Sequence, residues 1–183
     1  MKKILFLFIA IAAFNYSWAQ KATKPDMPVD NDTKLVTYTA VVNLDGVTRS
    51  EVYKRAYKFF KSYYAKFAAN TITVTDSVNG KMEAKAQFPT YKVLKNGVKT
   101  PADLLQYTFT IDVKDGKYRY TITKINIKAA SYKPIETYFS DTDPAKDEHW
   151  STLTQADDAF NKMIGDMREG MEKPSTPAKK ADW

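Results

Sequence analysis

Residues 107–127 read YTFTIDVKDGKYRYTITKINI, and this segment constrains the fold more than any other part of the chain. Polar residues alternate with aromatic and branched apolar residues on both sides of Asp115-Gly116, which is the period of half-buried strands. A two-residue turn at Asp115-Gly116, with the positive φ angles that such turns require, places the apolar residues of both strands on one face. These residues are Phe109, Ile111, Val113, Tyr118, Tyr120 and Ile122. We therefore predict an antiparallel hairpin with one buried face.

The opposite face of this hairpin is polar and should meet solvent. In the same register Asp112 lies opposite Arg119, which predicts a cross-strand ion pair. Further along the second strand the apolar residues move from even to odd positions. A β-bulge near Thr123 and Lys124 would absorb that change of phase, and we predict one there.

The chain before this hairpin predicts a strand and a helix. Apolar residues occupy the even positions from Val36 to Leu44, the period of a strand. Thr48 and Glu51 then have the spacing of a capping box, and we expect the helix to continue to about Phe67. Its apolar face comprises Val52, Ala56, Phe59, Phe60, Tyr63 and Phe67.

Another hairpin is predicted between residues 72 and 88. Its apolar residues share a face only if paired positions have numbers of equal parity, which favours a three-residue loop at 78–80 with Gly80 in the left-handed conformation. A long basic connection, Pro89 to Pro101, follows it and contains a possible small turn at Asn96-Gly97.

A second long connection, from Ala130 to Trp150, leads to a closing helix for which Thr152 and Gln155 suggest a cap. The apolar stripe of this helix comprises Leu153, Ala156, Phe160, Met163, Met167 and Met171. Sheet and helices each have one apolar side. We therefore predict an α+β fold in the order strand, helix, four strands, helix, with an antiparallel sheet and both helices on one face.

The ends of the chain differ from its middle. Residues 1–19 combine Lys2 and Lys3, a short apolar run and Ser17-Trp18-Ala19, and they predict a secretory signal peptide. Residues 20–33 and 173–183 are polar and contain proline, which predicts a disordered linker and a disordered tail around a single domain at 34–172. We expect an exported protein, periplasmic or secreted, with no transmembrane segment in the mature chain.

The helical RSEVYKRAYKFF, the Asn-Gly hairpin and YTFTIDVKDGKYRYTIT, together with the signal peptide and polar spacer, resemble an exported bacterial family of unknown function, family 4468. The resemblance covers about Lys34 to Ile127, and 112–120 is its most diagnostic stretch. It implies a TBP-like fold, similar to that of the TATA-box-binding protein. The family has no assigned catalytic residues, so the resemblance implies none here.

A fold of that type does not by itself imply nucleic-acid binding. A TATA-binding sheet meets the minor groove with apolar wedges and basic residues. The predicted outer face here is rich in threonine, mixed in charge and free of wedges. Together with the expected export, this composition predicts no nucleic-acid partner.

The formal net charge of +7 is spread unevenly along the chain. The first helix is strongly basic, whereas residues 133–172 are acidic. A basic helix attracts anionic lipid head groups or polysaccharide. We favour the alternative that the two helices are neighbours with complementary edges, because charged faces of amphipathic helices are usually solvated.

Candidate functional residues are few. Tyr53, Tyr57 and Tyr64 form a second aromatic stripe on the first helix, which is either a ligand or partner surface or the margin of the core. His149 is the sole histidine and cysteine is absent, so we expect no catalytic residue, no metal site and no cofactor. The acidic residues 141–148 lack the glycine and the final glutamate of a calcium loop. A pair of catalytic carboxylates is defined by distance in space, and the sequence leaves it open.

Two hypotheses for function follow. The first is a non-enzymatic module that binds an envelope or secreted protein partner through its long loops or a sheet edge. The second is a carrier of a small apolar ligand in a cavity between sheet and helices, suggested by the tyrosines of the first helix.

Overall fold

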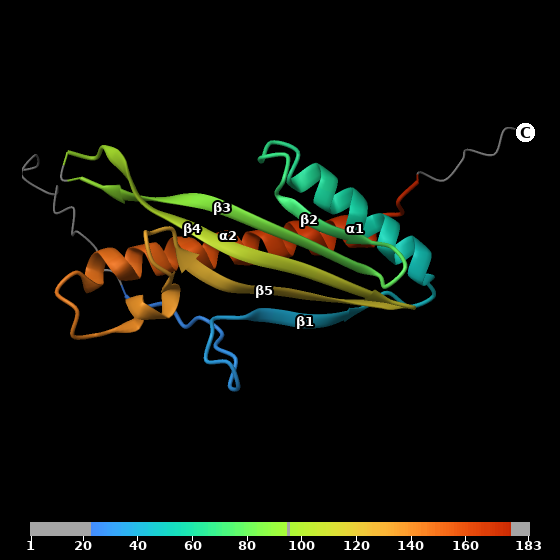
Figure 1. Cartoon of the computed structure of the whole chain (residues 1–183), viewed down its shortest axis with the longest axis horizontal. Coiled ribbons are helices and arrows are strands. Elements are labelled where there is room, and N and C mark those ends of the chain that lie inside the picture. Colours follow the sequence, from blue (N-terminus) through green and yellow to red (C-terminus); the bar gives the residue numbers. More distant parts are fainter. Residues whose placement is uncertain (1–22, 95, 177–183) are drawn as a thin grey trace, which may run out of the picture.

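The computed structural model describes residues 23–94 and 96–176, and Figure 1 shows an elongated molecule built around one antiparallel sheet. The strand order is β1-β5-β4-β3-β2, with β6 paired to β5. The strands are β1 (Tyr38–Asn43), β2 (Ile72–Asp76), β3 (Lys81–Val93), β4 (Lys99–Lys114), β5 (Lys117–Ile127) and β6 (Lys133–Pro134). The helices are α1 (Arg49–Tyr63), the 3-10 helix η1 (Ile135–Phe139) and α2 (Lys146–Glu172). This architecture confirms the predicted α+β class and element order, with β6 and η1 added inside the second connection.

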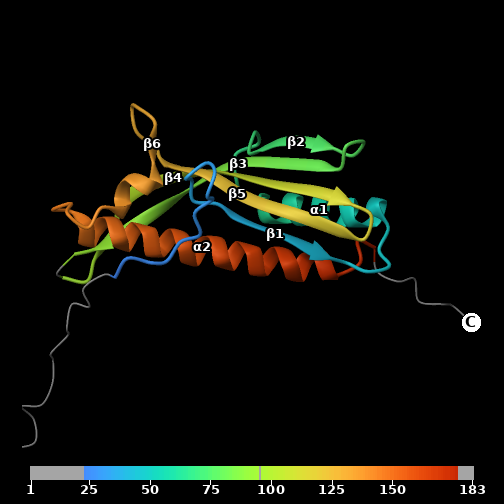
Figure 2. The same cartoon turned by 90° about the horizontal axis from the view of Figure 1, so that it is seen from below.

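Both long helices cover the same face of the sheet, as predicted (Figure 2). Phe109 on β4 stacks against Phe60 of α1 at 5.1 Å between ring centroids, and Tyr107, two residues earlier on that strand, meets Phe160 of α2 at 5.2 Å. Residues two apart on a strand point to the same side, so both helices pack on one apolar surface. The predicted apolar stripe of α2 is buried along its whole length.

The β4–β5 hairpin has the predicted register. Lys114 pairs with Lys117 across the turn, and Arg119 donates a hydrogen bond to Asp112 at 2.9 Å. The register shifts opposite Tyr107, and Lys124 has a φ of 54°, so the predicted bulge is confirmed. The expectation of two positive φ angles in the turn was wrong, because the turn reverses the chain with a positive φ at residue 116 alone.

The turn of this hairpin also anchors the start of α1. Thr48 accepts a hydrogen bond from the backbone of Glu51, which confirms this half of the predicted capping box, whereas the Glu51 carboxylate accepts from Arg55 and Ser175 instead. Asp115 accepts a hydrogen bond from the Arg49 backbone at 2.9 Å. Backbone N–H groups in the first turn of a helix lack partners within it, and the side chains of Thr48 and Asp115 supply them.

The first hairpin differs from prediction in its loop. Asp76 pairs with Lys81, which leaves four residues in the loop instead of three. A register shift between Ile72 and Val74 then gives equal parity at Ile72, which pairs with Ala84, whereas Val74 pairs with Glu83 and departs from the predicted pattern. Gly80 has the predicted positive φ, at 68°.

Both long connections contain more regular structure than predicted. The segment Pro89 to Pro101 is the end of β3 and the start of β4, closed by a turn at 96–97 in which Val98 donates a hydrogen bond to Asn96. The predicted cap at Thr152 and Gln155 was wrong, because α2 begins six residues earlier, at Lys146. The hydroxyl of Thr152 bonds instead to Asp103 on β4, and the amide of Gln155 bonds to the β3 backbone.

The flanking segments contact the domain where they are described. Met27 is buried in the core and Val29 bridges to Val36, so this part of the linker at 20–33 has more to bury than its composition predicted. Ser175, in the tail at 173–183, donates two hydrogen bonds to Glu51 on α1. The predicted signal peptide at 1–19 lies outside the described residues. Within the described ranges, no helix has the length and apolar character needed to span a membrane.

Candidate sheet-face binding groove

The three tyrosines singled out on α1 do not form one surface. Tyr57 is 41% exposed and Tyr53 is half-buried, whereas Tyr64 is only 4% exposed. The hydroxyl of Tyr64 lies 3.4 Å from that of Tyr107 and faces the sulfur of Met163. Burial raises the pKa of Tyr64, and the neighbouring Tyr107 adds to that shift. Tyr64 therefore belongs to the core, because it follows the buried Phe60 by one helical turn and packs edge-on against its ring at 5.6 Å.

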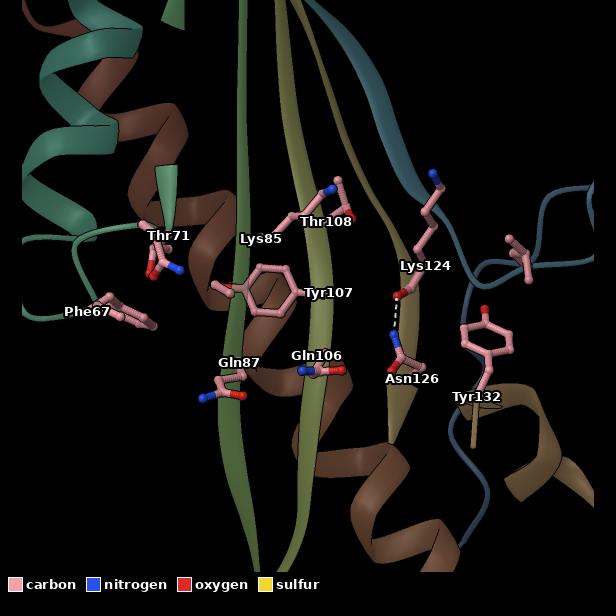
Figure 3. Close-up of a pocket in the computed structure, with 14 residues that line it drawn as sticks. Phe67, Thr71, Lys85, Gln87, Gln106, Tyr107, Thr108, Lys124, Asn126 and Tyr132 are labelled. Carbon is pink, nitrogen blue, oxygen red and sulfur yellow. Dashed lines mark hydrogen bonds between the residues drawn. The ribbon is translucent and has the colours of Figure 1, made fainter. Parts of the chain in front are cut away.

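A groove of about 770 Å³ crosses the other face of the sheet, opposite the helices (Figure 3). Its floor is formed by neighbouring positions of β3, β4 and β5. The α1–β2 connection forms one wall, and Leu35 with Tyr132 forms the other. The groove is lined by Leu35, Phe67, Ala68, Asn70, Thr71, Lys85, Ala86, Gln87, Gln106, Tyr107, Thr108, Lys124, Asn126 and Tyr132.

Two irregularities of the chain shape this groove. The bulge in β5 gives Lys124 a left-handed conformation, and its carbonyl accepts a hydrogen bond from Asn126 at 3.0 Å (Figure 3). Bulges commonly redirect a side chain in this way. On the other side, the early end of α1 places Phe67 in the connection, where it packs on Tyr64 at 5.1 Å. The prediction that Phe67 faces the core was wrong, since it is partly exposed at the groove.

The groove can donate and accept hydrogen bonds along its length. Carboxamides offer both donors and acceptors, and threonine hydroxyls do the same. The lining carboxamides are Asn70, Gln87, Gln106 and Asn126. Lys85 and Lys124 add two positive charges, and the lining contains no aspartate or glutamate. Lys85 forms a long ion pair, at 3.9 Å, with Glu83, which does not line the groove. The surface is therefore suited to a polar or anionic ligand.

Aromatic rings lie at both margins of the groove. Tyr132 is among the most exposed large apolar residues of the described chain, at 65%, and Phe67 is 37% exposed. Figure 3 shows the two rings at opposite margins of the polar floor. Such rings provide apolar contact without closing the groove, so that an extended ligand could pass between them.

Comparison with known proteins identifies the fold. Residues 38–128 match the family described as a domain of unknown function (DUF4468) with TBP-like fold. The chain belongs to this family. A DUF4468 family protein from Bacteroides ovatus has a similar crystal structure, with a TM-score of 0.63 at 16% identity over 82% of this chain and 92% of that one. A TBP-like protein from Parabacteroides distasonis matches with a TM-score of 0.55 at 14% identity over 78% of this chain and 97% of that one. No functionally curated protein matched the chain.

The family match covers most of the groove floor but not all of its walls. Lys85, Gln106 and Lys124 lie inside the matched segment, whereas Leu35 and Tyr132 lie outside it. Identities of 14–16% to the solved structures show a common fold and carry no information about ligands.

A second polar cluster lies where the β3–β4 end, η1 and α2 meet. Tyr138 is buried and donates a hydrogen bond to Asp103, which also accepts one from Thr152. Burial raises the pKa of Tyr138, and the Asp103 carboxylate raises it further. The ring of His149 stacks on Tyr138 at 3.7 Å and its Nδ1 lies 3.3 Å from Asp143. Asp103 accepts hydrogen bonds from both Tyr138 and Thr152, whereas the buried Nδ1 of His149 has no hydrogen-bond partner among the described residues, and none of these groups lines the groove.

The same cluster defines the surroundings of His149, the sole histidine of the sequence. Its ring stacks on Tyr138 of η1, and its Nδ1 lies close to the Asp143 carboxylate without a hydrogen bond to it. Among the described residues, no group of three or more histidine, cysteine or acidic side chains is arranged to hold a metal ion. Neither Asp103 nor Tyr138 belongs to a recognisable sequence motif. Their part in this cluster follows only from their contacts in the folded structure.

Proposed function

We propose that this protein is an exported, non-enzymatic module that binds an extended acidic segment of an envelope or secreted protein partner in the sheet-face groove. The supporting observation is the composition of that groove. It carries Lys85 and Lys124, four carboxamides and no acidic side chain. An acidic segment would pair with the lysines, and its backbone amides would bond to the carboxamides of the floor.

The lack of catalytic groups in the groove supports binding over catalysis. Its lining contains no histidine, cysteine or carboxylate, the side chains that most often transfer protons or attack a substrate. Export is proposed from the composition of residues 1–19. Mass spectrometry of the protein from native cells, after separation of periplasm and medium, would test it, and a chain beginning at Gln20 is expected.

The alternative, a carrier of a small apolar ligand, requires a cavity between the sheet and the helices. In the described structure that space holds tightly packed side chains. Phe60 and Phe109 are fully buried and stacked, and Phe160 contacts both Tyr38 and Phe88. The packing therefore favours the open groove as the binding surface.

Cross-linking in intact cells tests the protein-partner proposal. A photoreactive residue at Gln106, on the groove floor, is compared with one at Lys54, on the exposed side of α1. We expect a discrete protein adduct from position 106 only. We also expect the double variant Lys85→Glu/Lys124→Glu to lose this adduct, because it reverses both charges of the groove.

The matched control is Lys54→Glu/Lys61→Glu, which makes the same change in net charge on exposed positions of α1. This control should keep the adduct at position 106. A groove adduct composed of glycan, or an adduct that survives the groove reversal and is lost in the control, would contradict the proposal. Repeated absence of any protein adduct at position 106 would contradict it as well.

A further inference from the structure

β3 and β4 continue beyond the rest of the sheet as a two-stranded arm. β5 pairs with β4 only as far as Leu105, and β2 pairs with β3 only as far as Ala84. The remaining pairs run from Pro89 with Leu104 to Val93 with Lys99. Figure 1 shows this arm at one end of the long axis, near the start of α2.

The tip of the arm is apolar and exposed. Val93 is 63% exposed and Val98 is 51% exposed, and Tyr91 and Leu94 are exposed beside them. Four of the ten large apolar residues that are exposed in the described chain therefore lie within eight positions, which makes them a cluster and not scattered surface residues. None of the four lines the groove.

The exposed side chains of the tip sit on a formed turn. Leu94 donates a backbone hydrogen bond to Val98 at 2.9 Å, and Gly97 donates one to Leu94 at 2.8 Å. Gly97 has a φ of 82°, a conformation that glycine adopts without strain. The backbone groups of the turn are thus partly satisfied, and the apolar side chains point outward from a convex end.

Two lysines accompany this apolar cluster. Lys92 and Lys99 are exposed and flank Val93, with Lys99 directly opposite it in the ladder. The connection between η1 and α2 lies at the same end of the molecule (Figure 1), and this connection and the first turn of α2 contain Asp141, Asp143, Asp147 and Glu148. Any attraction of this end to an anionic surface therefore has to come from the arm itself.

The β3 edge of the arm is partly closed to another strand. Gln155 of α2 accepts a hydrogen bond from the Tyr91 backbone at 2.9 Å and donates one to the Tyr91 carbonyl at 2.8 Å. Pro89 has no N–H to offer. A partner protein that adds a strand would find these positions blocked, whereas a fluid apolar phase needs no backbone pairing.

We propose that the tip of the β3–β4 arm inserts its apolar side chains into the surface of a lipid bilayer, with Lys92 and Lys99 meeting anionic head groups. A convex apolar tip cannot enclose a small ligand, but it can enter the boundary between head groups and acyl chains. Tyrosine is enriched at that boundary, and lysine there extends its charge toward water. The attachment is reversible, because the apolar surface is small.

Vesicle co-sedimentation at about 0.15 M salt tests this proposal. The chain from Gln20 is used, because the apolar run of residues 1–19 would bind vesicles by itself. We expect binding to vesicles of phosphatidylcholine with phosphatidylglycerol, and weaker binding to phosphatidylcholine alone. The variant Val93→Ser/Leu94→Ser should lower the bound fraction at limiting lipid about tenfold. The matched control Val78→Ser changes an 80% exposed valine in the loop between β2 and β3, and this variant should bind as the parent chain does.

Tryptophan fluorescence gives an independent readout. Leu94→Trp should show a blue shift with the mixed vesicles, and Val78→Trp should not. The proposal fails if neither lipid mixture binds the chain, if Val93→Ser/Leu94→Ser binds as well as the parent, or if the protein sediments equally without vesicles. It also fails if Lys54→Glu/Lys61→Glu on α1 abolishes binding while the tip variant does not.

Discussion

Phe109 and Thr110 are consecutive residues of β4, yet they occupy opposite environments. Phe109 is fully buried against Phe59 and Phe60 of α1, whereas Thr110 lies on the open face between Glu83 and Thr121. The same contrast holds along the strand, with aromatic and aliphatic side chains on one side and threonine, glutamine and charged residues on the other. The difference indicates that the two faces of the sheet have different roles. The covered face determines stability, and the open face is available for binding.

The largest test of this contrast is a pair of truncations on adjacent positions. Phe109→Ala should lower the free energy of unfolding by about 3–5 kcal/mol, because it leaves a cavity between sheet and helix. Thr110→Ala should change it by less than about 0.5 kcal/mol. Urea unfolding followed by circular dichroism measures both. Equal losses at the two positions would contradict this difference in roles.

Arg55 tests whether the helix layer is held together by more than apolar contact. Its guanidinium bonds to Glu51 on α1 and to the backbone carbonyls of Met171 and Glu172 at the end of α2. Arg55→Met keeps the apolar stem and should cost about 2 kcal/mol in urea unfolding, because charged hydrogen bonds are lost. Lys54→Met, on the exposed side of the same helix, is the control and should be nearly neutral.

Glu51 makes the stability of the helix layer depend on pH. Hydrogen bonds from the backbone and hydroxyl of Ser175, and then from Arg55, lower the pKa of this carboxyl from 4.5 to about 2. Its folded pKa is depressed, so its contribution is complete above pH 4.5 and is lost as the pH falls toward 2. Glu51→Gln should cost about 1 kcal/mol at neutral pH. Thermal unfolding of both proteins should show that difference shrinking below pH 4.5, and a constant difference would contradict the assignment.

The smallest expected effect concerns the ion pair of the open face. Arg119 and Asp112 have side chains that are 58% and 36% exposed, compared with 10% and 29% for Arg55 and Glu51. Solvent screens the exposed pair, so a double-mutant cycle with Asp112→Asn and Arg119→Gln should give about 0.3 kcal/mol of coupling. A coupling energy as large as that of Arg55 with Glu51 would contradict the contrast between the faces.

The sequence predicts those parts of the fold that depend on local patterns. The alternation around Asp115-Gly116 gives the correct register, the Asp112–Arg119 pair and the bulge at Lys124, because turn length and side-chain period together determine which residues face the core. The stripe of α2 is equally local. These elements need no knowledge of what packs on them.

The remaining errors arise where distant contacts decide the structure. Thr152 lies inside α2, which begins at Lys146, and its hydroxyl bonds to Asp103 on β4 instead of capping the helix. Met27 is buried in the core, although the polar residues around it in the sequence do not indicate burial. For the candidate site, alternation places Lys85 and Thr108 on the outer face. The walls of the groove are formed by connecting segments, and hydrophobic periodicity does not predict the path of such segments.

The hydrogen bond from the Arg49 backbone to Asp115 joins residues that are 66 positions apart. The first turn of α1 is therefore completed only when the β4–β5 hairpin has formed and docked. Closing so long a loop is slow compared with forming a helix or a hairpin alone. The N-terminal end of α1 should thus acquire protection from hydrogen exchange late in refolding, together with the central hairpin, although it lies well before that hairpin in the sequence.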